Sequence, residues 1–181
     1  TTFIIALQND LAITQVVSPR TKDVIKYPLS SFIPVQVRYT NVGINSVTSF
    51  ETTIQISLDG VVKYEETATW PTNPPQSLTT GQSITLNFAN FRPRDVGIYD
   101  FLVTTTLLNA NDDDLKNNRI PRTGSEFKLE VSYEIEAEAL SITVPGDQVF
   151  IGRPILPIAR FKNNGVSDIS DLPASMYIIR L

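Results

Sequence analysis

Polar and apolar residues alternate one by one along several stretches of this chain, and this period of two constrains the fold more than any other feature. In the run 50–58, Ile54, Ile56 and Leu58 fall on one face, and polar residues fall between them on the other. Successive side chains of a strand point to opposite faces, so this pattern predicts a half-buried antiparallel strand. Apolar residues at helical spacing are missing, so we expect an all-β fold.

The alternating stretches recur at the short intervals of a β-sandwich. Asp59-Gly60 separates two of them, and this pair favours a type I′ hairpin, which needs a positive φ at both central residues. The other expected strands share the alternation and lie at 11–17, 33–39, 61–64, 84–88, 99–107 and 127–133. About seven strands in this order predict an immunoglobulin-like antiparallel β-sandwich over residues 9–134.

The segment that opens the longest alternating run has the form Asp-x-Gly-x-Tyr, at residues 95–99. In immunoglobulin-like sandwiches a Tyr at this place forms a tyrosine corner, in which its hydroxyl bonds backbone a few residues upstream. We therefore expect Tyr99 to form such a corner and Phe101 to fill the space between the sheets. The alternative is a glycine turn followed by an ordinary strand.

A second sequence feature is an internal repeat. Residues 11–14 (Leu-Ala-Ile-Thr) return as 140–143 (Leu-Ser-Ile-Thr), and residues 38–44 return as 160–166, each time around an Asn-x-Gly. The offsets of 129 and 122 differ by seven, so this alignment shortens the loop between the two strands by seven residues. Repeats of this kind predict an array of similar units.

The repeat sets the expected domain organisation. Residues 1–8 are interpreted as the end of a preceding module or a linker, and residues 135–181 as the first strands of a second, incomplete immunoglobulin-like sandwich. Such units need neighbours to cover their open ends, which favours a tandem array. The alternative is an extension that is not a repeat and that packs on the first domain.

Composition excludes several classes of function. Among the 181 residues there is no Cys and no His, which excludes zinc sites built on them, a Ser-His-Asp triad and a Cys nucleophile. Glu65 and Glu66 are adjacent on a strand and point to opposite faces, so they cannot share a substrate. No acid–base pair or nucleophile can be assembled, so we expect no enzyme.

The net charge of −4 argues against nucleic acid as a binding partner. No apolar run approaches the ~18 residues that a membrane-spanning helix needs.

Two candidate sites stand out. The first is the dense set of oxygen donors between two strands, made of Asn109, Asn111, Asp112, Asp113 and Asp114. Ca²⁺ takes six to eight such oxygens, so this loop could hold Ca²⁺; the alternative is a solvated hairpin tip without a cofactor. The second is Trp70, the only Trp, beside Pro71. It could recognise a glycan or protein, or it could fold over the end of the sandwich.

With these residues in hand, the first module resembles the CARDB family, the cell-adhesion-related domain found in bacteria. The motifs that carry the resemblance occur in a shared order: Asp10-Leu11, residues 37–43 (Val-Arg-Tyr-Thr-Asn-Val-Gly), residues 58–60 (Leu-Asp-Gly), residues 78–83, residues 97–99 (Gly-Ile-Tyr) and Asn117-Asn118. The chain departs from the family at 70–76, where a Pro-rich loop is longer than expected.

The resemblance implies sandwich domains strung along large secreted or surface proteins, and it carries no catalytic residue. We therefore expect a structural or adhesive repeat segment of a bacterial surface or secreted protein, outside the cell, with neighbouring repeats of the same chain as its partners. The alternatives are a module that binds surface glycan or another protein, in a Ca²⁺-dependent manner or not, and an accessory domain of a secreted hydrolase.

Overall fold

In the computed structural model, residues 7–73, 76–146, 152 and 154–177 are described. The chain divides into two compact units, Thr1–Val131 (unit 1) and Ser132–Leu181 (unit 2). The described residues form strands and one 3₁₀ helix, η1 (Leu115–Asn117). No helix in this part of the chain is long and apolar enough to cross a membrane.

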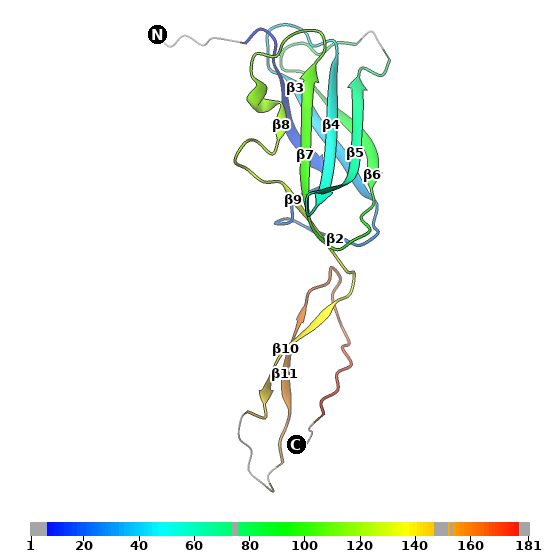
Figure 1. Cartoon of the computed structure of the whole chain (residues 1–181), viewed down its shortest axis with the longest axis vertical. Coiled ribbons are helices and arrows are strands. Elements are labelled where there is room, and N and C mark those ends of the chain that lie inside the picture. Colours follow the sequence, from blue (N-terminus) through cyan, green and yellow to red (C-terminus); the bar gives the residue numbers. More distant parts are fainter. Residues whose placement is uncertain (1–6, 74–75, 147–151, 153, 178–181) are drawn as a thin grey trace, which may run out of the picture. The chain divides into compact units, whose positions relative to one another are not determined.

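Unit 1 is built from two antiparallel sheets (Figure 1). The first sheet has the order β1-β3-β6, with β1 at Leu11–Ser18, β3 at Ile33–Asn41 and β6 at Ser83–Phe91. The second has the order β2-β9-β7-β4-β5, with β2 at Lys26–Pro28, β9 at Lys128–Ser132, β7 at Gly97–Leu107, β4 at Phe50–Leu58 and β5 at Val61–Trp70. The short β8 (Arg119–Ile120) pairs with β7.

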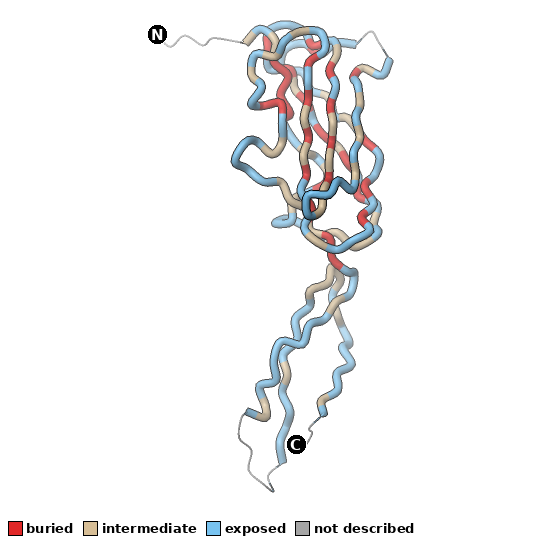
Figure 2. Tube along the Cα trace, in the orientation of Figure 1, coloured by how far each residue is buried: buried red, intermediate tan, exposed pale blue. Residues whose placement is uncertain are grey.

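The core of unit 1 lies between these sheets, and buried residues alternate with half-buried or exposed ones along β3, β4 and β7 (Figure 2). The long edge strands β5 and β6 are buried at only one and two positions. Along β4 the buried positions are Phe50, Thr52, Ile54 and Ile56. Seven of the residues that alternation places on core faces are at most 1% exposed: Val35, Val37, Ile54, Ile56, Tyr99, Phe101 and Val103. Leu58, at the end of β4, is only half-buried. The predicted all-β, immunoglobulin-like sandwich is confirmed.

Local turn chemistry is also as predicted at the hairpin between β4 and β5. Asp59 has φ = 51° and Gly60 has φ = 76°, the left-handed conformations that a type I′ turn requires.

The sequence did not predict β2 and β8, and β5 continues to Trp70, well beyond the expected 61–64. Strands of two or three residues are too short to show a period of two, which explains the first difference.

Unit 2 contains β10 (Ala137–Val144) paired antiparallel with β11 (Ile158–Asn163). Their register reproduces that of β1 and β3: Ala137 lies opposite Asn163 as Leu11 lies opposite Asn41. The two β-bulges also recur at equivalent places, one before Gln15 and Ser141, the other before Ser18 and Val144.

This register corrects the sequence alignment of the first strand. Leu11 corresponds to Ala137 and not to Leu140, so the offset there is 126, and the loop between the two strands is four residues shorter in unit 2. The alignment failed because Leu140-Ser141-Ile142-Thr143 looks similar to residues 11–14 but lies three positions further along its strand. An alignment by residue identity misplaces a strand when its position is defined by which residues face the core and by where its β-bulges lie.

In unit 2 every residue of β10 and β11 is exposed or half-buried (Figure 2). Phe161, which corresponds to Tyr39, is 43% exposed, whereas Tyr39 is 0% exposed. The segment 172–177 lies beside these strands and lines one groove with them. That residues 135–181 belong to a second sandwich stays a prediction.

Candidate functional site

The repeated feature of both units is the way in which the chain enters its first strand. We call the entering segment together with the Asn-x-Gly loop the entry clasp; in unit 1 it comprises residues 7–10 and 41–45. Four backbone N–H groups of the loop donate to carbonyls of the entering segment: Val42 and Gly43 to Asp10 (2.9 and 3.1 Å), Ile44 to Leu7 (3.0 Å) and Asn45 to Gln8 (2.8 Å). The loop therefore adds a short ladder to the end of β1.

Asn41 and Gly43 are the residue types that this clasp requires. The fully buried Asn41 accepts the N–H of Gly43 at its Oδ1 (3.0 Å) and donates from Nδ2 to the carbonyl of Asn45 (2.8 Å), which closes the loop. A Cβ on Gly43 would lie 2.6 Å from the backbone N of Asp10 and 2.8 Å from the carbonyl O of Gln8. Only glycine allows the two backbones to come this close.

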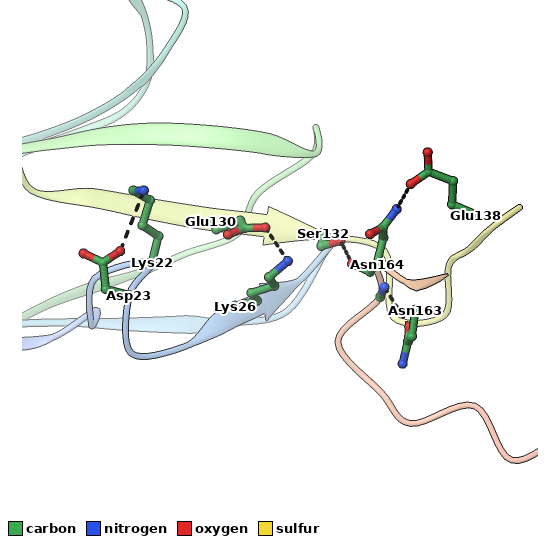
Figure 3. A network of polar contacts seen from close by, with 9 residues as sticks. Lys22, Asp23, Lys26, Glu130, Ser132, Glu138, Asn163 and Asn164 are labelled. Atoms are coloured by element: carbon green, nitrogen blue, oxygen red, sulfur yellow. Dashed lines mark hydrogen bonds and ion pairs between the residues drawn. The ribbon is translucent and has the colours of Figure 1, made fainter. Parts of the chain in front are cut away.

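Unit 2 builds the same clasp from its own residues (Figure 3). Asn163 accepts the N–H of Gly165 at its Oδ1 (2.9 Å) and donates from Nδ2 to the carbonyl of Ser167 (2.9 Å). A Cβ on Gly165 would lie 2.6 Å from the N of Glu136 and 2.8 Å from the O of Glu134. These distances equal those at Gly43, so the two clasps have the same backbone geometry at the glycine.

Side chains add further bonds around the second clasp. Ser132 donates its hydroxyl to the carbonyl of Asn164 (3.0 Å), and the amide of Asn164 donates to a carboxylate oxygen of Glu138 (2.8 Å), as Figure 3 shows. Within unit 1, the same figure shows the ion pair between Lys26 and Glu130, with Nζ and Oε1 2.6 Å apart.

In unit 1 the aspartates of the acidic loop (residues 109–114) also hold the entering segment. Asp113 accepts the backbone N–H groups of Gln8 (2.8 Å) and Asn9 (3.0 Å) at one carboxylate oxygen. Asp112 accepts the N–H of Leu11 (3.0 Å). These carboxylates therefore supply charged acceptors for backbone N–H groups at the start of the first strand.

The other members of the predicted Ca²⁺ cluster point elsewhere. Asn109 accepts the N–H groups of Thr48 (3.3 Å) and Ser49 (3.2 Å), Asp114 caps η1 by accepting the N–H of Lys116 (3.1 Å), and Asn111 is exposed. Across the described ranges, no three His, Cys, Asp or Glu side chains are grouped so that they could hold a metal ion. The five predicted residues thus do not form one site by themselves, and Ca²⁺ binding stays a prediction.

Residues that the sequence analysis had named only as family motifs, and not as site residues, lie buried next to this loop. Asp10 is only 3% exposed, and its carboxylate accepts the Nδ2 of Asn117 (2.8 Å). Burial, together with the nearby charges of Asp112, Asp114 and Asp113, raises the pKa of Asp10 above its usual value. Asn117 and Asn118 had entered the sequence argument only as an Asn-rich pair.

Trp70, the second predicted site, belongs to the core. It ends β5, is 4% exposed, and stacks on Phe50 with ring centroids 5.4 Å apart. The ring cannot stack on a glycan from this position, so the recognition role considered for Trp70 is wrong, and the packing alternative describes it. The physical reason is that β5 continues through residue 70 and carries the indole inward.

The tyrosine corner is confirmed. The hydroxyl of Tyr99 donates to the carbonyl of Asp95 (2.7 Å), four residues upstream. Burial raises the pKa of Tyr99, so the hydroxyl stays protonated as this bond requires.

The adjacent carboxylates of β5 serve separate structural bonds. Glu65 accepts from the amide of Gln55 (2.7 Å), whereas Glu66 accepts from the hydroxyl of Tyr64 (2.6 Å) and the N–H of Ala89 (2.8 Å). Glu66 thereby links the edge strands of the two sheets, since Ala89 lies in β6.

No family model and no curated protein matches the sequence. Among solved structures, the crystal structure of the CARDB domain of the PF1109 protein from Pyrococcus furiosus, in complex with di-metal ions, is similar. It is 19% identical, the match covers 72% of this chain and 95% of that one, and the TM-score is 0.50. A solution NMR structure of the same domain is 17% identical, with 69% and 96% covered and a TM-score of 0.46. The fold expected from the resemblance to CARDB domains is thus confirmed.

Proposed function

We propose that this chain is a structural and adhesive repeat segment, a stalk or spacer, of a large bacterial cell-surface or secreted protein. The observation that carries the proposal is the entry clasp, which the chain builds twice with the same bonds and the same close approach at Gly43 and Gly165. A chain that repeats the start of a sandwich is organised as an array of similar units, and arrays serve to span distance.

The path of the chain through unit 1 supports a mechanical role. The first strand, β1, begins at one end of the sandwich, and β9, the last strand, finishes at the opposite end (Figure 1). Tension applied to the two ends of the unit therefore acts along the strands. The β1–β3 ladder is then sheared, and its hydrogen bonds are loaded together instead of opening one after another.

The residues between the two units also support a spacer. Ser132 ends β9, and Tyr133 and Glu134 already accept backbone bonds from the loop of the second clasp. No free Gly- or Ser-rich segment lies between the last strand and the clasp, and linkers of that composition are the flexible ones. The connection therefore lacks a linker of the flexible kind.

The place of action and the partners belong to the same proposal. The segment lies outside the cell, and its partners are neighbouring repeats of the same chain. An antibody raised against the chain is then expected to label intact cells of the source organism.

Force spectroscopy tests the mechanical role. The full chain is pulled between its termini, flanked by marker domains of known unfolding force. Unit 1 is expected to give one discrete force peak that releases roughly 125 residues, or ~440 Å at ~3.5 Å per residue. Extension without a peak, at the force that stretches an unfolded chain, would show that the unit does not resist load and would remove the proposal.

A further inference from the structure

The entry clasp of unit 2 contains Asn164-Gly165, the one asparagine–glycine pair among the 181 residues. The equivalent pair of unit 1 is Val42-Gly43, so the two clasps differ at this position. Asparagine is a thermolabile residue. A following glycine favours its deamidation, because glycine has no side chain to keep its backbone nitrogen away from the asparagine side chain. The bonds around this pair control whether that nitrogen can react.

Deamidation joins the two residues before it releases ammonia. The backbone N of Gly165 loses its proton and attacks Cγ of Asn164, so that a C–N bond forms, the Cγ–Nδ2 bond breaks, and ammonia leaves. Water then opens the resulting succinimide ring at either carbonyl. The products are aspartate and isoaspartate, in which the main chain runs through the former side chain. Water is the only co-reactant, and nothing is oxidised or reduced.

The closed clasp restrains the attacking group. The N–H of Gly165 donates to Oδ1 of Asn163 (2.9 Å) and to the carbonyl of Glu136 (3.3 Å). On the other side of the same peptide bond, the carbonyl of Asn164 accepts the hydroxyl of Ser132 (3.0 Å). Both polar groups of the peptide that has to turn and lose its proton are therefore bonded.

The group under attack is restrained as well. The Nδ2 of Asn164 donates to a carboxylate oxygen of Glu138 (2.8 Å; Figure 3), and the backbone N–H of Asn164 donates to the carbonyl of Glu136 (2.9 Å). A hydrogen bond to a charged acceptor is a strong one. Turning Cγ of Asn164 onto the nitrogen of Gly165 therefore competes with the bond to Glu138.

We propose that Asn164 is a deamidation site that the closed clasp protects, so that the reaction takes place when the clasp of unit 2 opens. Folded proteins open locally, and a reaction of the open form follows its population when opening and closing are fast. The described part of unit 2 forms a two-stranded sheet, β10-β11, and such a sheet by itself is marginally stable. Deamidation of Asn164 then records covalently how long this clasp has been open.

Neither product restores the closed clasp. An ionised aspartate at position 164 has no donor for Glu138 and places a second negative charge beside it, where the amide lies 2.8 Å away. Isoaspartate adds a carbon to the main chain directly before Gly165, where even a Cβ would lie 2.6 Å from the backbone N of Glu136. Opening that has led to deamidation is therefore lasting.

Peptide mapping by mass spectrometry measures the reaction in the full chain, incubated at mildly alkaline pH with and without urea. Each bond that must break favours the closed form by about two- to tenfold, so the folded chain should deamidate at Asn164 at least roughly tenfold more slowly than the chain in urea. Glu138→Ala frees the side-chain amide and should speed the reaction of the folded chain by about two- to tenfold. Glu134→Ala is the matched control, because this exposed carboxylate has the same charge but makes no hydrogen bond or ion pair among the described residues.

Hydrogen exchange separates an effect on the clasp from unfolding of the unit. The amides of β10 and β11 are expected to stay as protected in Glu138→Ala as in the natural chain. If they lose protection, Ser132→Ala takes the place of Glu138→Ala with the same expectation, since it removes only the bond to the carbonyl of Asn164. Chain deamidated in urea, refolded and isolated by its additional negative charge should exchange the amide hydrogen of Gly165 faster than the natural chain does.

Three results would overturn the proposal. Equal rates in the folded and the urea-unfolded chain would show that the clasp does not protect Asn164. Equal rates in Glu138→Ala and Glu134→Ala, with β10 and β11 still protected, would show that the bond to Glu138 does not restrain the reaction, and the same holds for Ser132→Ala where it is used. A deamidated chain that exchanges the Gly165 amide as slowly as the natural chain would show that the clasp closes again.

Discussion

Substituting Gly43 by alanine tests the entry clasp directly. The added methyl group would lie 2.6 Å from the backbone N of Asp10, whereas ordinary contacts of a Cβ begin at 3.4 Å. The two backbones must therefore separate by about 0.8 Å. The obstacle is backbone on both sides, so no side chain can rotate to make room.

The size of the effect follows from the bonds across this contact. The carbonyl of Asp10 accepts two N–H groups, from Val42 and Gly43. Losing two such bonds costs about 1–3 kcal/mol at ~0.5–1.5 kcal/mol each. The φ of Gly43 is not left-handed, so alanine can adopt it. At such a position alanine favours folding by roughly 0.4–1 kcal/mol, because it lowers the conformational entropy of the unfolded chain. We expect a net destabilisation of about 1–2 kcal/mol.

Urea unfolding followed by the fluorescence of Trp70 measures this free energy for unit 1, because Trp70 is the only Trp and is buried in its core. Gly146→Ala is the control, since no atom lies within 4 Å of a Cβ built there, and it should leave the transition unchanged. A Gly43→Ala chain as stable as the natural one, or more stable, would refute the argument, because the entropy contribution would then outweigh the clash.

Two further predictions concern the interior of unit 1. Asp10→Asn should raise the free energy of unfolding at pH 7. The native pKa of Asp10 lies above its ordinary value, so the charged form of Asp10 costs stability above that raised pKa. In the natural chain, the native state binds this proton more readily than the unfolded state does. The stability advantage of Asp10→Asn, measured by urea unfolding at several pH values, should therefore shrink as the pH falls from above the raised pKa toward the ordinary pKa. An advantage that grows toward acid pH would contradict this reasoning. Phe101→Ala should cost ~3–5 kcal/mol, because the ring is 1% exposed and packs 5.0 Å from Phe127 between centroids. The same substitution at Phe32, 66% exposed, should cost less than about 1 kcal/mol in the same assay.

Much of the fold could be predicted because each element carried a local physical signal. The alternation in 50–58 fixed which side chains face the core, and Asp59-Gly60 fixed the turn that follows. The corner at Tyr99 was recognisable because it depends on a short motif and on a bond that spans only four residues. Signals of this kind are contained within a few neighbouring positions.

The candidate sites could not be predicted in the same way because they depend on segments far apart in the chain. Asp112 and Asp113 bind the N–H groups of residues 8, 9 and 11, about a hundred positions away, and nothing in an aspartate-rich loop indicates that distant backbone will use its oxygens. The side of the strand on which Trp70 lies likewise depended on where β5 ends.

The entry clasps have a consequence for how such proteins arise. Each is closed by a loop of its own unit: residues 41–45 seal the entrance at 7–10, and residues 163–167 seal the entrance at 133–136. A gene segment encoding one unit therefore brings its own closure with it. Unequal recombination can lengthen or shorten a protein of this kind by whole units, without requiring matched changes in the segments on either side.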